Sequence, residues 1–215
     1  MVKIMKKGFI NILLYLFVPT ILTIIFYNYS RLNNFNYFIF NTIPYLVLLI
    51  YYLIIYKKTF INYFKKLNKK NILHTIIIWL IGFILMLLAN YIINYIIIPN
   101  GLSPNELGNR ELLYNHKITY FILFCILIPI LEEISFRLEF KHNIKNNYIF
   151  LILSSILFAI IHIISINSLI ELLYIIPYLI LGITFSGIYI KTNNILCNII
   201  AHIIHNTITV LIILF

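Results

Sequence analysis

Two adjacent carboxylates and an arginine lie within an apolar stretch of the chain, at residues 131–137. Glu133 and Arg137 are four residues apart, one turn along a helix face, so they can pair and offset much of the cost of burying charge. Glu132 points about 100° away from Glu133 and has no such partner. Placing an ionisable group at the centre of a membrane helix costs about 2.5 to 3.5 kcal/mol, and such groups tend to line a cavity or face a partner. Glu132 is therefore a candidate base.

Two later apolar stretches each carry one polar helical turn. Phe158 and His162 are four residues apart in one stretch, and His202 and Asn206 are four apart in the other. Either histidine alone would be interpreted as a hydrogen-bonded interior residue, and Phe158 as core packing. Their occurrence together with Glu132, on three separate helices, favours a shared site.

The composition indicates what kind of protein must position these groups. The 215 residues are 62% hydrophobic and 10% charged, whereas soluble domains are about 25% charged. A spanning helix needs about 20 mainly apolar residues, and apolar runs between polar breaks number seven. These runs are roughly 9–27, 37–56, 72–98, 118–140, 148–166, 168–189 and 194–215. We expect an all-α polytopic membrane protein with about seven transmembrane helices in one bundle.

The net charge of +10 does not indicate nucleic-acid binding, because the distribution of the basic residues is explained by the orientation of the chain in the bilayer. With a cytoplasmic N-terminus, 13 of the 16 Lys and Arg residues fall on the cytoplasmic side, as the positive-inside rule predicts. Seven spans then place the C-terminus outside. We expect an integral protein of a bacterial cell membrane, with the lipid bilayer as a partner and no nucleic acid. Nothing in the sequence specifies an oligomeric state.

The three polar turns, taken in order, resemble the motifs of the CPBP family of intramembrane proteases. They are Glu-Glu-x-x-x-Arg at 132–137, Phe-x-x-x-His at 158–162 and His-x-x-x-Asn at 202–206. That family includes the type II CAAX prenyl endopeptidases and Abi-like bacterial relatives linked to bacteriocin immunity and peptide processing. The resemblance covers about residues 118–212. Residues 1–71 hold N-terminal transmembrane helices without a motif, and residues 72–215 are the expected catalytic membrane core.

The resemblance implies a role for each motif residue in the hydrolysis of a peptide or membrane protein. Catalytic roles fall to Glu132 and His162, which would hold and deprotonate a water, and to His202 and Asn206, which would donate hydrogen bonds to the oxyanion. Supporting roles fall to Glu133, Arg137 and Phe158. The activity implied is that of a glutamate-dependent endopeptidase acting near the cytoplasmic membrane face.

Other chemistries are weaker or absent. No Asp exists in the chain, so aspartyl catalysis is excluded, and no His-Glu-x-x-His zinc motif occurs. A metal held by Glu132, His162 and His202 is not excluded by ligand types, although we favour a scheme without a cofactor. Ser186 beside Gly187 faintly resembles a rhomboid motif but leaves the Glu pair unexplained. The functional alternatives are a non-catalytic bacteriocin-immunity or peptide-binding membrane protein and, behind it, a proton-coupled transporter.

One expectation conflicts with a shared site. At 1.5 Å per residue, Glu132 and His202 each lie about 10 Å from the cytoplasmic boundary, whereas His162 lies about 20 Å from it. For the three to meet, the 148–166 helix must be displaced, or a hydrated cavity must open. Pro129, one turn before the Glu pair, can kink its helix because it leaves the carbonyl of Cys125 without its usual donor.

Overall fold

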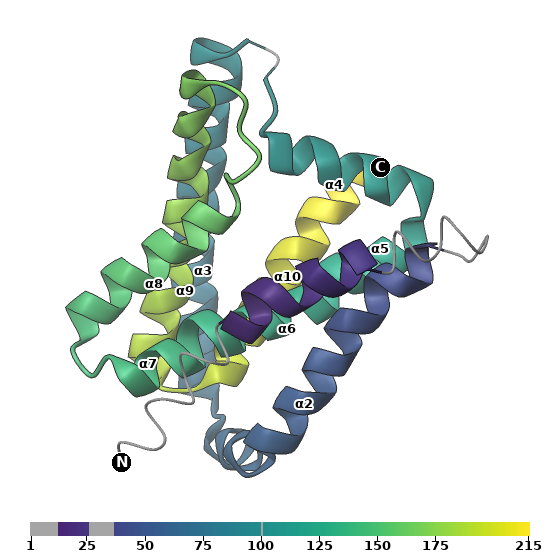
Figure 1. The fold of residues 1–215 in the computed structure, drawn as a ribbon. Coiled ribbons are helices and arrows are strands. Elements are labelled where there is room, and N and C mark those ends of the chain that lie inside the picture. Colours follow the sequence, from purple (N-terminus) through teal and green to yellow (C-terminus); the bar gives the residue numbers. More distant parts are fainter. Residues whose placement is uncertain (1–12, 26–36, 100) are drawn as a thin grey trace.

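The structure is a computed structural model that describes residues 13–25, 37–99 and 101–215. Helices dominate these residues (Figure 1). Their bounds are Leu13–Ile25, α2 Tyr37–Lys66, α3 Lys69–Tyr91, α4 Pro104–Asn115, α5 Lys117–Ile122, α6 Ile128–Glu133, α7 Phe140–Asn143, α8 Asn147–Ile161, α9 Ile175–Thr192 and α10 Ile195–Leu214. A 3₁₀ helix, Leu169–Tyr174, leads into α9.

Three π-helical segments interrupt this pattern. Ile92–Ile97 extends α3, while Leu123–Leu127 and Ile134–Glu139 join α5, α6 and α7 into one continuous helix. The Glu pair lies at the end of α6, between the last two of these segments. A π-helical turn holds one more residue than an α-helical turn and is frequent at functional sites.

Five helices among the described residues are long and apolar enough to cross a bilayer. They are Asn41–Lys66, Lys69–Ile97, Lys117–Asn143, Leu169–Thr192 and Ile195–Leu214. Each corresponds to one of the expected spans, so the prediction of a helical polytopic membrane protein is confirmed. The expected 9–27 run is described only as Leu13–Ile25, and the expected 148–166 run is helical only as Asn147–Ile161. A count of seven spans stays a prediction.

Asparagines begin several of these helices at tight turns. The Asn68, Asn146 and Asn194 side chains accept hydrogen bonds from backbone N–H groups of the first turns of α3, α8 and α10. This satisfies donors that a helix start otherwise leaves unpaired. Asn193 ends α9 in the left-handed conformation, with φ of 45°. The chain can therefore reverse direction between α9 and α10 within two residues.

Small residues let α3, α8 and α9 pack closely. A Cβ added to Gly182 of α9 would lie 2.8 Å from the Ser155 Cα of α8, and a Cβ at Gly82 of α3 would collide with Thr184 of α9. Close approach through small residues is the usual way in which membrane helices associate. In Figure 1, α8 ends part of the way along α9, and the chain then continues to the far end of the bundle.

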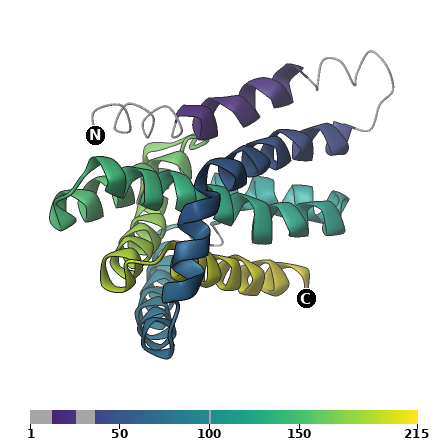
Figure 2. The same ribbon diagram turned by 90° about the horizontal axis from the view of Figure 1, so that it is seen from below.

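Seen from below, α5–α7 lies between α10 on one side and the helix Leu13–Ile25 on the other (Figure 2). The end of α6 is therefore enclosed by helices from both ends of the chain. This enclosure explains why Glu132, at 4% exposed, and Glu133, at 0%, are both buried.

Candidate active site

Glu133 is the centre of a buried polar network. Its Oε2 lies 3.5 Å from the Arg137 Nε and accepts a hydrogen bond of 3.1 Å from the Asn198 Nδ2. Its Oε1 lies 2.8 Å from the His202 Nδ1. The carboxylate thus ties the Glu pair to α10 through two side chains that are one helical turn apart. A buried carboxylate with this many partners has its desolvation cost largely compensated.

Arg137 is fully buried and is neutralised chiefly by Glu133. Its guanidinium carbon lies 4.7 Å from the centroid of the Phe158 ring and 5.7 Å from that of Phe185. One terminal nitrogen is 3.4 Å from the Gly182 carbonyl oxygen, while Nε and Nη1 have no hydrogen-bond partner among the described residues. The aromatic faces supply the attraction that a cation without further acceptors needs.

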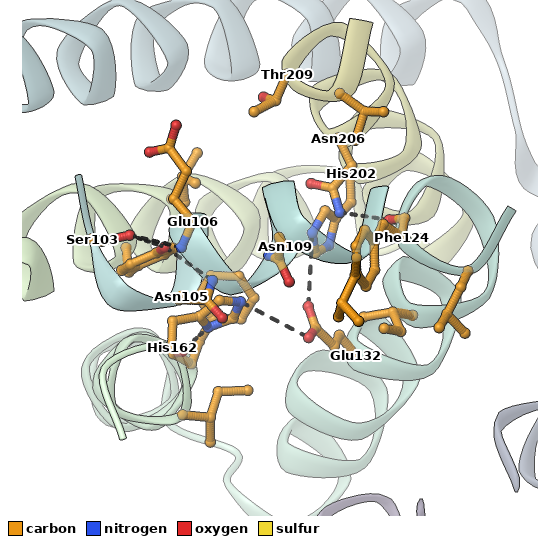
Figure 3. A pocket seen from close by; sticks show the side chains of 18 of the residues that line it. Ser103, Asn105, Glu106, Asn109, Phe124, Glu132, His162, His202, Asn206 and Thr209 are labelled. Atoms are coloured by element: carbon orange, nitrogen blue, oxygen red, sulfur yellow. Dashed lines mark hydrogen bonds and ion pairs between the residues drawn. The ribbon is translucent and has the colours of Figure 1, made fainter. Parts of the chain in front are cut away.

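Glu132 faces both histidines. Its Oε1 lies 4.0 Å from the His162 Nε2, and its Oε2 lies 3.7 Å from the His202 Nε2 (Figure 3). Three polar turns from α6, the end of α8 and α10 therefore converge on one point, as the sequence predicted. The 4.0 Å separation is too long for a direct hydrogen bond. It suits a single water, since an oxygen about 2.8 Å from both atoms would subtend an angle of about 90°.

The protonation of His162 follows from its backbone contact. The His162 Nδ1 lies 2.7 Å from the Phe158 carbonyl oxygen, and a carbonyl only accepts, so Nδ1 carries the proton. In the neutral ring, Nε2 then presents a lone pair toward Glu132. The ring is held between Tyr178, stacked at 4.7 Å between centroids, and Phe158 at 4.6 Å. Tyr178 is itself fixed to the start of α4, because Asn105 donates to its hydroxyl at 3.0 Å.

The expected difference in depth does not keep His162 and Glu132 apart, because their side-chain atoms lie 4.0 Å from one another. The α8 helix ends at Ile161, and His162 caps it with its backbone N–H bonded to the carbonyls of Ala159 and Ile160. The 148–166 interpretation was therefore wrong in its final residues. His162 reaches Glu132 from the end of a helix rather than from the middle of one.

Asn206 is positioned by an irregularity in the helix that carries the Glu pair. The Ile128 N–H bonds to the Leu123 carbonyl, five residues earlier. In that register the next donor, to the Phe124 carbonyl, would be residue 129, which is a proline and has no N–H. The Phe124 oxygen instead accepts a hydrogen bond of 2.9 Å from the Asn206 Nδ2. The expectation that Pro129 frees the Cys125 carbonyl was therefore wrong by one residue, because in the π-helical register residue 129 stands opposite the Phe124 carbonyl.

A cavity of about 670 Å³ lies over these groups. Glu132, His162, His202 and Asn206 are among the residues that line it (Figure 3). Polar residues at the start of α4 and along its first turns also line it, namely Ser103, Asn105, Glu106 and Asn109. Binding sites for small molecules and peptide segments have volumes of about 300–1,000 Å³. The cavity is therefore large enough for a short stretch of peptide beside Glu132.

Some members of the site were not predicted. Asn198 precedes His202 by four residues and Asn206 by eight, so a polar stripe along α10 was a usable signal for it. Tyr178 carried no such signal, because tyrosines are frequent throughout the chain. Ser186 is fully buried and donates to the Ser154 hydroxyl at 3.2 Å, so its contacts are those of a packing residue. Within the described residues, no group of three or more His, Cys or Glu side chains is arranged to hold a metal ion.

The segment that carries the three motifs matches a known protein family. Residues 114–208 match the family described as "Type II CAAX prenyl endopeptidase Rce1-like", and the chain therefore contains a domain of this family. The resemblance drawn from the three motifs is confirmed. The matched segment runs from α4 to α10 and includes every motif residue.

A bacterial relative extends the similarity beyond this domain. The chain is 29% identical over 164 residues to the "UPF0177 protein YxdF" of Lactococcus lactis subsp. lactis (strain IL1403), covering 73% of this chain and 86% of that protein. No solved structure matches the chain. Neither the family description nor the relative's name mentions bacteriocin immunity, so that association stays a prediction from the sequence.

Proposed function

We propose that this protein is an intramembrane endopeptidase in which Glu132 and His162 activate a water for attack on a peptide carbonyl. The observation that carries the proposal is the 4.0 Å gap between the Glu132 Oε1 and the His162 Nε2. Both atoms are hydrogen-bond acceptors, so a water between them donates both of its hydrogens. Its oxygen lone pairs are then left for the carbonyl carbon.

The reaction proceeds through a tetrahedral intermediate. The water oxygen bonds to the carbonyl carbon while Glu132 takes the proton as general base. Collapse of the intermediate breaks the C–N bond, and Glu132 returns the proton to the leaving nitrogen. General acid–base catalysis of this kind contributes about 10²–10⁴-fold in rate.

His202 and Asn206 are the proposed oxyanion donors. The His202 Nδ1 donates to Glu133, so Nε2 donates to the oxyanion when the ring is an imidazolium. The net charge of the buried site is then zero. The carboxylates of Glu132 and Glu133 are balanced by the Arg137 guanidinium and the His202 imidazolium. Asn206 uses one amide hydrogen for the Phe124 carbonyl and retains the other. Side-chain donors are needed here because a membrane helix commits its backbone N–H groups to its own hydrogen bonds.

The test compares the native protein with Glu132→Gln, which keeps the shape of the side chain and removes the base. Proteomes of cells expressing either form at equal levels are compared for a peptide terminus that Glu132→Gln abolishes. The purified proteins are then assayed on a synthetic peptide spanning that site. We expect cleavage to fall at least 100-fold. Glu111→Gln is the matched control, because Glu111 is an exposed carboxylate of α4 that lies outside the cavity.

Full activity of Glu132→Gln would reject the proposal. An unchanged cellular phenotype for alanine variants of Glu132, His162 and His202 would favour the non-catalytic alternative. Proton flux in liposomes without a cleavage product would favour transport. Assay after exhaustive chelation decides whether a metal takes part.

A further inference from the structure

A tyrosine far from the motifs in sequence contacts the proposed base directly. The Tyr15 hydroxyl donates a hydrogen bond of 2.8 Å to the Glu132 Oε1. Tyr15 lies on the helix Leu13–Ile25, about a hundred residues before the segment 114–208 that matches the protease family. The contact therefore joins a part of the chain without a motif to the centre of the site.

The ring of Tyr15 is held by the same aromatic cluster that surrounds His162. Tyr15 meets the Phe136 ring edge-on, with 5.6 Å between centroids and 87° between planes. Phe136 in turn meets Phe158 edge-on at 6.2 Å. Edge-to-face pairs of this kind have a preferred geometry, so the position of the hydroxyl is set by packing as well as by its hydrogen bond.

The hydrogen bond determines which carboxylate oxygen faces which histidine. Oε1, which accepts from Tyr15, is also the oxygen 4.0 Å from the His162 Nε2, while Oε2 faces His202. A carboxylate oxygen has two lone pairs, so the hydroxyl occupies one and leaves the other for the gap where the water is proposed. Without this donor the carboxylate is free to rotate about its last side-chain bond.

We infer that Tyr15 is a positioning residue for Glu132, and that the helix Leu13–Ile25 forms part of the active site. This inference rests on the proposed peptidase function. The helix also forms a wall of the cavity, since Tyr15, Pro19 and Thr23 recur every four residues on the face that lines it. In Figure 2 the helix lies beside α2, on the opposite side of the view from α10.

The test is Tyr15→Phe, which keeps the ring against Phe136 and removes only the hydroxyl. We expect kcat for the peptide assay to fall about tenfold while KM changes less than twofold, because the base is misoriented and the cavity is intact. Tyr63→Phe is the matched control. Tyr63 has a hydroxyl 3.0 Å from that of Tyr189, and neither residue lines the cavity. This control is expected to keep native kcat and KM.

Testing Tyr15→Phe in a second variant, Glu132→Asp, distinguishes a positioning role of Tyr15 from a purely structural one. In Glu132→Asp, the shorter side chain withdraws the carboxylate from the Tyr15 hydroxyl, so adding Tyr15→Phe should cause no further loss. Coupling of this kind is expected only for residues that act through one another. A tenfold loss in the native background that vanishes in Glu132→Asp supports the inference.

Other outcomes overturn it. Equal losses in both backgrounds would assign Tyr15 a purely structural role. Native activity of Tyr15→Phe, alongside an inactive Glu132→Gln, would reject the inference and leave the peptidase intact. Absence of cleavage by the native protein would reject both.

Discussion

Replacing Pro129 with alanine should make the helix more regular and the proposed peptidase slower. The substitution adds an N–H at the position whose partner, in the local register, is the Phe124 carbonyl. That carbonyl currently accepts from Asn206, at 2.9 Å. The new backbone donor competes with the side chain, and Asn206 loses the contact that holds it beside the cavity.

The magnitude follows from the strength of that contact. A side-chain amide to carbonyl hydrogen bond stabilises by a net of about 1 kcal/mol. Losing it lowers the oriented fraction of Asn206 about fivefold, and kcat should fall by about the same factor. The upper limit is the loss from removing an oxyanion donor completely, about 10²–10³-fold. Thermal stability should stay level or rise, because alanine is up to about 3 kcal/mol more favourable than proline within a helix.

The assay measures kcat on the synthetic peptide and thermal unfolding in detergent for Pro129→Ala, Asn206→Ala and the double variant. We expect the double variant to match Asn206→Ala, since Pro129 is proposed to act only through Asn206. An unchanged kcat for Pro129→Ala, or losses that multiply in the double variant, would refute this reasoning.

Two further predictions concern packing and the rejected serine route. Gly182→Val places atoms within 2.8 Å of Ser155, so α8 must move away from α9, and we expect a loss of about 1–3 kcal/mol or more in unfolding measurements. Gly108→Ala meets no atom within 4 Å and should unfold at or slightly above the native temperature, which makes it the control. Ser186→Ala should keep peptide cleavage within about twofold, because Ser186 is fully buried, bonds to Ser154 and Ser155 and does not line the cavity. A collapse of cleavage without loss of fold would restore the serine route.

Contacts between residues of the same helix were the part of the site that the sequence predicted well. The separation of four residues between Glu133 and Arg137 predicted their contact, and the separation between Phe158 and His162 brings the two rings within 4.6 Å. Both predictions needed only helical periodicity. The convergence of Glu132, His162 and His202 was inferred from residue types on three helices, and the distances in the structure agree with it.

Contacts set by tertiary packing could not be predicted in the same way. Tyr15 reaches Glu132 across 117 residues, and no periodicity relates the two. The length of α8 was also misjudged, because His162 continues an apolar run and ends the helix by bonding its own ring to the Phe158 carbonyl. The π-helical register around Pro129 is a third case, since a proline indicates a break without indicating which carbonyl it frees.

The short length of α8 has a consequence for the surrounding lipid. Its 15 residues rise about 22 Å, against a hydrocarbon thickness of about 30 Å. Bilayers accommodate an element that is too short by thinning locally. The hydrocarbon layer beside α8 would then be thinner, and the lipid headgroups would lie closer to the level of His162. Under the proposed function, a peptide substrate that diffuses within the bilayer would meet this thinner region beside Glu132 and His162.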